Sequence, residues 1–237
     1  MVDHTKVFNF SAGPCILPKE VFRRAQEEMF DWHGSGLSVM EMSHRGTYFK
    51  EIIETTKKDL RTLMEIPDDF EIFFFQGGAS QLFAGIPLNL IGDDTEAGAT
   101  YLTTGLWSEG AYDEGCKYGK MTEAHNTKKH NYHDIDHHSE WKVDKDGKYF
   151  AFCSNETVQG FEFHEFPWEV VPKGMLVVCD MSSNFASKKI DWSRYDVVYA
   201  GAQKNVGPAG VCITIIKKSI IKPCKKDAPL MMDWALT

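Results

Sequence analysis

The hydrophobic pattern of the chain changes near residue 70. Before that point, apolar side chains recur at three- and four-residue spacing in two stretches, which predicts two amphipathic helices. The first helix begins at Pro18 and is stopped by Gly34 and Gly36, and the second ends at Pro67. Residues 1–17 lack this periodicity and are predicted to form an extended, irregular segment ahead of one large domain over residues 18–237.

After residue 70, short apolar runs alternate with helical patterns. Runs that are apolar at every position are typical of strands covered on both faces. Strands that alternate with helices predict right-handed crossovers, and therefore an α/β fold with a mainly parallel sheet and helices on both faces. The predicted strands are Glu71–Phe75, Ala99–Thr103, Tyr149–Cys153, Leu176–Cys179 and Val197–Ala200, and the predicted helices are Gln81–Leu90 and Trp107–Lys117.

Charge and cysteine content narrow the possible partners. The formal net charge of −8 argues against a nucleic-acid or anionic-membrane surface, because both need a basic footprint. No apolar run reaches the length of a membrane span. The six cysteines are dispersed without a C-x-x-C pair, and no signal peptide opens the sequence, so we expect a reducing, cytoplasmic compartment.

One lysine stands between two apolar, β-branched runs in Val197–Ile216. Lys204 lies in a loop rich in Gly, Pro and Asn, next to Gln203 and Asn205. Partial burial would lower the pKa of its ammonium group and make the amine a nucleophile toward a carbonyl. The alternative interpretation is an ordinary surface-loop lysine.

Residues that follow the other predicted strands suggest a ligand site. Ligands of parallel sheets collect at the carboxyl ends of the strands. The small residues Gly77–Ser80 open a helix and could hold a phosphate, or they could be a plain strand–helix turn. Trp107 could stack on a planar ring or pack in the core. Thr157 offers a hydroxyl group, and Asp180 is a carboxylate after a buried strand that could instead cap a turn.

A single ligand accounts for all of these features. Pyridoxal phosphate carries an aldehyde that could react with Lys204 and a ring nitrogen that could pair with Asp180. Its ring could stack on Trp107, and its phosphate could bind the turn Gly77–Ser80. An ionised carboxylate would keep the pyridine nitrogen protonated, which makes the ring an electron sink. Pyridoxal phosphate is therefore the predicted cofactor.

A second polar region lies between His125 and Asp146. It contains five histidines, yet their spacing matches no closed zinc site and no cysteine is near. Such a cluster could bind a transition metal, but the pattern favours an exposed connecting loop, and we predict no metal site.

The chain resembles the phosphoserine aminotransferase family, which belongs to the class V aminotransferases. The resemblance covers nearly the whole chain, and its last motif is highly specific. The motifs are Asn9-Phe-Ser-Ala-Gly-Pro14, Val39-Met-Glu-Met-Ser-His-Arg-Gly46, Phe75-Gln-Gly-Gly78, Asn155-Glu-Thr157 and Tyr199-Ala-Gly-Ala-Gln-Lys-Asn-Val-Gly-Pro-Ala-Gly210. The resemblance implies the fold type I of pyridoxal-phosphate-dependent transferases.

The resemblance also implies roles for individual residues. Lys204 corresponds to the lysine that forms the Schiff base, Asp180 to the pyridinium partner and Trp107 to the stacking residue. Arg45, preceded by His44, corresponds to the arginine that binds a substrate carboxylate, a role suited to a planar guanidinium and not to lysine. Further contacts to the cofactor are implied for Ala79, Ser80, Thr157 and Gln203.

The implied reaction is reversible amino transfer between L-glutamate and 3-phosphohydroxypyruvate, giving O-phospho-L-serine and 2-oxoglutarate. The resemblance further implies a homodimer with the site at the subunit interface. Family chains continue beyond the position matching Thr237 into a small C-terminal domain with further basic residues, so we expect this 237-residue chain alone to transaminate poorly. The alternatives are another class V enzyme, such as an alanine–glyoxylate aminotransferase or a cysteine desulfurase, and a non-catalytic scaffold.

Overall fold

The computed structural model describes residues 8–237, which fall into two compact units, Met1–Pro67 and Asp68–Thr237. The predicted segment 1–17 lies partly outside the described residues. Its described part, residues 8–17, contains no helix or strand. The predicted division after residue 17 stays a prediction.

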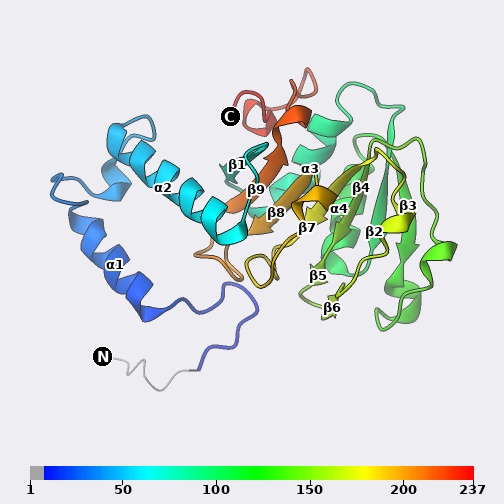
Figure 1. Cartoon of the computed structure of the whole chain (residues 1–237), viewed down its shortest axis with the longest axis horizontal. Coiled ribbons are helices and arrows are strands. Elements are labelled where there is room, and N and C mark those ends of the chain that lie inside the picture. Colours follow the sequence, from blue (N-terminus) through cyan, green and yellow to red (C-terminus); the bar gives the residue numbers. More distant parts are fainter. Residues whose placement is uncertain (1–7) are drawn as a thin grey trace. The chain divides into compact units, whose positions relative to one another are not determined.

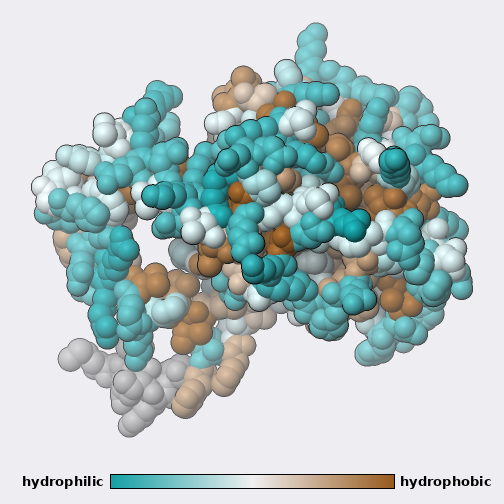
Figure 2. All heavy atoms as spheres, in the orientation of Figure 1, coloured by the Kyte–Doolittle hydropathy of each residue, from teal (hydrophilic) through white to brown (hydrophobic). Residues whose placement is uncertain are grey.

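The first unit contains the two predicted helices and leaves much apolar surface exposed. The helix α1 (Lys19–Phe30) buries none of its residues, and Phe22 and Phe30 are among its exposed side chains. A 3₁₀ turn, η2 (Val39–Glu41), begins with a capping box between Ser38 and Glu41. The helix α2 (Thr47–Met64) follows. Figure 2 shows apolar side chains of this unit as brown spheres among hydrophilic ones.

The second unit is built on a seven-stranded sheet in the order β1-β9-β8-β7-β4-β2-β3 (Figure 1). Only β9 runs against its neighbours, because β8 and β9 form a hairpin and β1 pairs antiparallel with β9. All other neighbours are parallel. The strands are β1 (Phe70–Phe75), β2 (Gly98–Thr103), β3 (Lys120–Asn126), β4 (Tyr149–Cys153), β7 (Leu176–Asp180), β8 (Val197–Gly201) and β9 (Cys212–Lys217).

The five predicted strands and the mainly parallel sheet are confirmed. The strand β9 is the second apolar run of Val197–Ile216, and β3 is a strand that was not predicted. β3 was missed because it carries polar side chains at the sheet edge, where no apolar run is needed. A short hairpin pairs β5 (Asn155–Glu156) with β6 (Phe161–Glu162). The remaining described turns are the 3₁₀ elements η3 (Thr127–His130), η4 (His138–Glu140), η5 (Trp168–Val170), η6 (Trp192–Arg194), η7 (Lys218–Ile220) and η8 (Leu230–Met232).

Two neighbouring helices cover one face of the sheet. The helices α3 (Gly78–Leu90) and α4 (Leu106–Gly115) pack against each other and on the strands, and their apolar side chains share a core with Tyr101 and Tyr149. Alternate residues of β4 point the other way, where Phe152 stacks on Phe166 at 4.1 Å between ring centres. Since the unit Asp68–Thr237 has no other helix longer than one 3₁₀ turn, the predicted helices on the second face stay a prediction.

Burial of the cysteines agrees with the sequence analysis. All six thiols are free, and the three predicted to be core residues, Cys153, Cys179 and Cys212, are buried. In the described part of the chain, none of the helices is both long and apolar enough to cross a lipid bilayer.

Candidate active site

Lys204 lies at the carboxyl end of β8, in the loop that turns into β9. Hydrogen bonds from the backbone N–H groups of Val206 and Gly207 to the Ala202 carbonyl close this loop. The Lys204 side chain is half-buried. Its ammonium nitrogen donates a hydrogen bond to the Thr157 hydroxyl and lies 5.0 Å from the centre of the Trp107 ring. Thr157 and Trp107, which were predicted to share a site with Lys204, therefore both contact its amine.

Asp180 is the last residue of β7 and is 5% exposed. Its Oδ1 accepts a 2.8 Å hydrogen bond from the backbone N–H of Ser182. Burial raises the pKa of this carboxyl, and the Ser182 hydrogen bonds and the positive charge of Lys204 act in the opposite direction. No arginine or lysine of the described residues forms an ion pair with it. A buried carboxylate of this kind is expected to bind a cationic group.

The ends of β7 and β8 are tied together beside this carboxylate. The Ser182 hydroxyl accepts a 3.0 Å hydrogen bond from the backbone N–H of Gly201, the last residue of β8. The distance between Asp180 and the start of the Lys204 loop is thus set by the sheet and by one serine.

Trp107 is the second residue of helix α4, and a residue that the sequence analysis did not assign holds its backbone there. Glu156 is fully buried, and its carboxylate accepts hydrogen bonds from the backbone N–H groups of Trp107 (3.1 Å) and Ser108 (2.9 Å) and from the Ser108 hydroxyl (2.5 Å). A carboxylate at a helix N-terminus satisfies N–H groups that have no partner within the helix. The only sequence signal was its position between Asn155 and Thr157 in the quoted motif.

The turn after β1 exposes the amino end of α3. Gly77 and Gly78 have φ angles of 80° and 63°, and a Cβ atom at residue 77 would lie 2.5 Å from the Gln81 side chain, so glycine is required there. No side chain caps this helix, which leaves the first N–H groups available to an anion. Ala79 is half-buried and Ser80 is exposed at this end.

A small pocket lies under α3 and α4, beside Trp107 and Asp180. Phe83, one turn after Ser80, lines it together with Trp107, Asp180 and Tyr199. The indole N–H of Trp107 is buried without a hydrogen-bond partner in the described part of the chain. The pocket thus places the Trp107 ring and the Asp180 carboxylate among the same apolar side chains.

Gln203 is half-buried next to Lys204, whereas Arg45 and His44 belong to the other unit. Both side chains of this pair are exposed on the unit Met1–Pro67. Their predicted part in substrate binding stays a prediction.

The prediction of an exposed loop from residue 125 onward is wrong at its start. His125 lies in β3 and is only 7% exposed. The imidazole is buried because it packs against Trp141, with ring centres 6.5 Å apart, and its nitrogens face the backbone N–H and the carboxylate of Asp136.

The comparisons with known proteins agree with this geometry. Residues 7–229 match the model of the family described as aminotransferase class-V. The chain belongs to the class-V aminotransferases.

Within that family, the most similar relatives include phosphoserine aminotransferases. The chain is 45% identical over 232 residues to phosphoserine aminotransferase 1, chloroplastic, of Arabidopsis thaliana, covering 98% of this chain and 53% of the relative. It is 44% identical over 229 residues to phosphoserine aminotransferase of Pseudomonas fluorescens, covering 97% and 62% respectively. The chain thus spans between about half and two thirds of the length of these curated relatives.

Solved structures give the same result. A phosphoserine aminotransferase from Bacillus circulans subsp. alkalophilus superimposes with a TM-score of 0.90 at 34% identity, over 98% of this chain and 63% of that one. A phosphoserine aminotransferase from Trichomonas vaginalis, solved with bound PLP, superimposes with a TM-score of 0.85 at 38% identity, over 98% of this chain and 64% of that one. The predicted α/β fold of the family is confirmed.

Proposed function

We propose that the chain carries the pyridoxal-phosphate site of a phosphoserine aminotransferase, which transfers an amino group between L-glutamate and 3-phosphohydroxypyruvate to give O-phospho-L-serine and 2-oxoglutarate. The observation that carries this proposal is the meeting of the Lys204 amine, the Trp107 ring and the Thr157 hydroxyl at the strand ends, with Asp180 in the same pocket as Trp107. The relatives named above support the substrate pair.

The residues present fit pyridoxal phosphate. The carboxylate of Asp180 is buried without a paired cation, as expected for a partner of a protonated ring nitrogen. The uncapped amino end of α3, with Ala79 and Ser80, suits a phosphate group. When bound, the cofactor supplies an aldehyde that condenses with amines and a ring that withdraws electrons from the substrate's α-carbon.

The residues of the site would then divide the work of binding the cofactor, moving a proton and binding the substrate. Lys204 would hold the aldehyde covalently and, once released, move the α-proton as general base and acid. Trp107 would orient the ring from one face, and Thr157 and Gln203 would contact its polar edge. Arg45, with His44, would bind the substrate carboxylate through its guanidinium group.

Spectroscopy of the chain with added pyridoxal phosphate tests this proposal. We expect a visible absorption band that shifts on binding, and borohydride reduction should then fix the cofactor mass on Lys204. Lys204→Ala should abolish both signals, whereas Lys188→Ala, which removes an exposed lysine that pairs with Glu162, should change neither. Absence of the band in the wild-type chain would favour the non-catalytic scaffold.

The substrate class is tested separately with the loaded chain. O-phospho-L-serine and L-glutamate should convert the bound cofactor to its amine form in a single turnover at concentrations at least tenfold lower than L-alanine does, a preference of about 1.4 kcal/mol. Equal conversion by L-alanine would indicate another class V enzyme.

We also propose that two copies associate, with the site at their interface. Exposed Phe8, Phe10, Phe22 and Phe30 support this, because such side chains on the first unit form an apolar surface that a partner would cover. Light scattering should give twice the chain mass of 26.9 kDa, and a monomer at micromolar concentration would contradict it. The buried free thiols support a reducing, cytoplasmic location, which a fluorescent fusion would test.

A further inference from the structure

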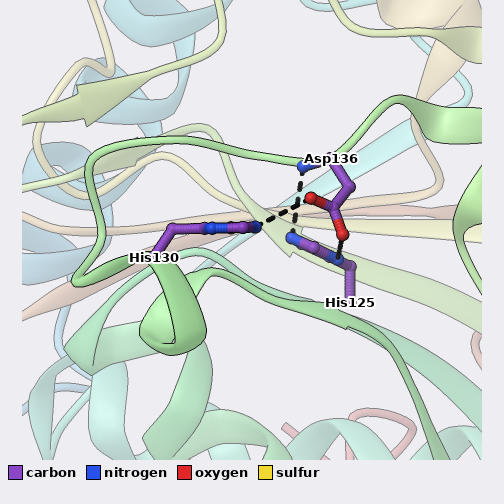
Figure 3. A group of neighbouring side chains, drawn as sticks. All are labelled: His125, His130 and Asp136. Atoms are coloured by element: carbon purple, nitrogen blue, oxygen red, sulfur yellow. Dashed lines mark hydrogen bonds and ion pairs between the residues drawn. The ribbon is translucent and has the colours of Figure 1, made fainter.

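Three side chains that can bind metals converge beside the edge strand β3. His125 is the penultimate residue of that strand, His130 ends the 3₁₀ turn η3, and Asp136 follows six residues later. Figure 3 shows the three side chains pointing toward one another across the loop between η3 and residue 136. No part of the proposed aminotransferase chemistry uses them.

The geometry of these groups suits one small cation. The Nε2 atom of His130 is 2.7 Å from Oδ1 of Asp136, and Nδ1 of His125 is 3.6 Å from Oδ2. One ligand atom of each residue lies within 4.8 Å of the other two, and among the described residues no other group of His, Cys, Asp and Glu meets this condition. Ligand atoms around a tetrahedral zinc are about 3.3 Å apart for bonds of about 2.0 Å, so small side-chain rotations would bring the three groups to this spacing.

The surrounding residues hold two of the three ligands in place. The Trp141 indole N–H donates a 3.0 Å hydrogen bond to the Asp136 carbonyl, and the ring lies parallel to that of His125 within 21°. The Thr103 hydroxyl donates a 2.7 Å hydrogen bond to the His125 carbonyl. Such outer contacts orient ligands before the metal arrives.

We propose that His125, His130 and Asp136 form a binding site for a divalent transition metal, best suited to Zn²⁺, with three protein ligands and one open coordination position. Two imidazoles and one carboxylate are the ligand set that zinc accepts with a water molecule in fourth place. The metal would fasten the segment 127–136 to the end of β3.

Lys129 competes with the metal for Asp136. Its ammonium group forms an ion pair with the carboxylate, and its side chain is 53% exposed. Because it can move into solvent, we expect it to weaken binding without preventing it. Lys129→Met should therefore raise the zinc affinity by up to about fivefold, since exposed ion pairs contribute up to about 1 kcal/mol.

Zinc titration of the chelator-treated, untagged chain tests the site, with a chromogenic zinc indicator as competitor. We expect one zinc per chain, and an affinity at least about tenfold lower in His130→Ala and in Asp136→Asn. Zinc should raise the midpoint of thermal unfolding of the wild-type chain and not that of Asp136→Asn. Both substituted side chains are partly exposed, so the variants should keep the circular dichroism of the parent.

His133→Ala is the matched control, because it removes an exposed histidine from the same loop. Its zinc affinity should equal that of the wild-type chain. Equal losses in His133→Ala and His130→Ala would show nonspecific histidine binding and overturn the proposal, as would a wild-type chain that takes up no zinc. Neither readout depends on pyridoxal phosphate, so the test stands apart from the proposed aminotransferase function.

Discussion

The carboxylate of Glu156 accepts a 3.1 Å hydrogen bond from the backbone N–H of Trp107, 49 residues away in the sequence. The next residue after Glu156 is Thr157, whose hydroxyl contacts Lys204, and the Trp107 ring lies 5.0 Å from the same lysine nitrogen. Glu156 therefore links two of the side chains that surround the amine. We regard it as a positioning residue, since it reaches the site through its neighbours.

Replacing Glu156 with Gln should damage both stability and cofactor binding. Both carboxylate oxygens face donors, so an amide NH₂ group would be placed against the N–H of Trp107 or of Ser108. We expect a loss of about 1–3 kcal/mol in the free energy of unfolding, and weaker pyridoxal phosphate binding at temperatures where the variant is folded. Urea unfolding and an absorbance titration measure the two effects. Glu169→Gln, at an exposed carboxylate, should change neither, and unchanged cofactor affinity in Glu156→Gln would remove the positioning role.

Compared with the wild type, the cofactor-free Asp180→Asn variant should become more stable as the pH rises. Burial raises the folded-state pKa of Asp180, so the carboxyl stabilises the fold only while it is protonated, and this contribution is lost as the pH rises through the folded pKa. Asn has no such loss, and its amide oxygen can still accept the Ser182 hydrogen bond. The difference in unfolding free energy, variant minus wild type, should increase as the pH rises from about 4, the usual pKa of an unfolded Asp, through the folded-state pKa of Asp180. A flat difference would contradict the assignment, and pyridoxal phosphate affinity should fall in the same variant.

Replacing Trp107 with a smaller ring should weaken cofactor binding, and removing the ring should weaken it further. Aromatic stacking contributes about 0.5–1.5 kcal/mol, so Trp107→Ala should lower pyridoxal phosphate affinity about two- to thirteenfold and Trp107→Phe should lower it less. Trp168→Phe is the control, because Trp168 packs against Phe166 and Tyr195 and does not line the pocket of Trp107. Full affinity in Trp107→Ala would mean that the indole is only a core residue.

The buried pair Tyr101 and Tyr149 should show non-additive effects on stability. Their hydroxyl groups are 2.6 Å apart in the core beneath the pocket. Tyr149→Phe leaves the other hydroxyl buried without its partner and should lower the unfolding free energy by about 1–3 kcal/mol. The double variant, with Phe at both positions, should recover most of this loss because no polar group is stranded. Additive losses in chemical denaturation would argue against a direct hydrogen bond.

Apolar periodicity was sufficient for most of the fold. The five predicted strands are present because a run such as Tyr149–Cys153 can be buried on both faces only inside a sheet. Strand β3 was not predictable in this way, since an edge strand made of Lys, Thr, Glu and His residues carries no apolar run. For the same reason His125 was expected in an exposed loop, although it is buried.

The sequence alone determined which residues could do the chemistry: one lysine in a Gly- and Pro-rich loop, one carboxylate after a buried strand, and small residues at a helix start. Only the tertiary structure decided which of them meet, because contacts such as Lys204 with Thr157 and Trp107 depend on strand order and on side-chain direction. The contacts of Glu156 and the grouping of His125, His130 and Asp136 were likewise decided only by the tertiary structure. Their partners are far apart or irregularly spaced in the sequence, and no periodic pattern records such contacts.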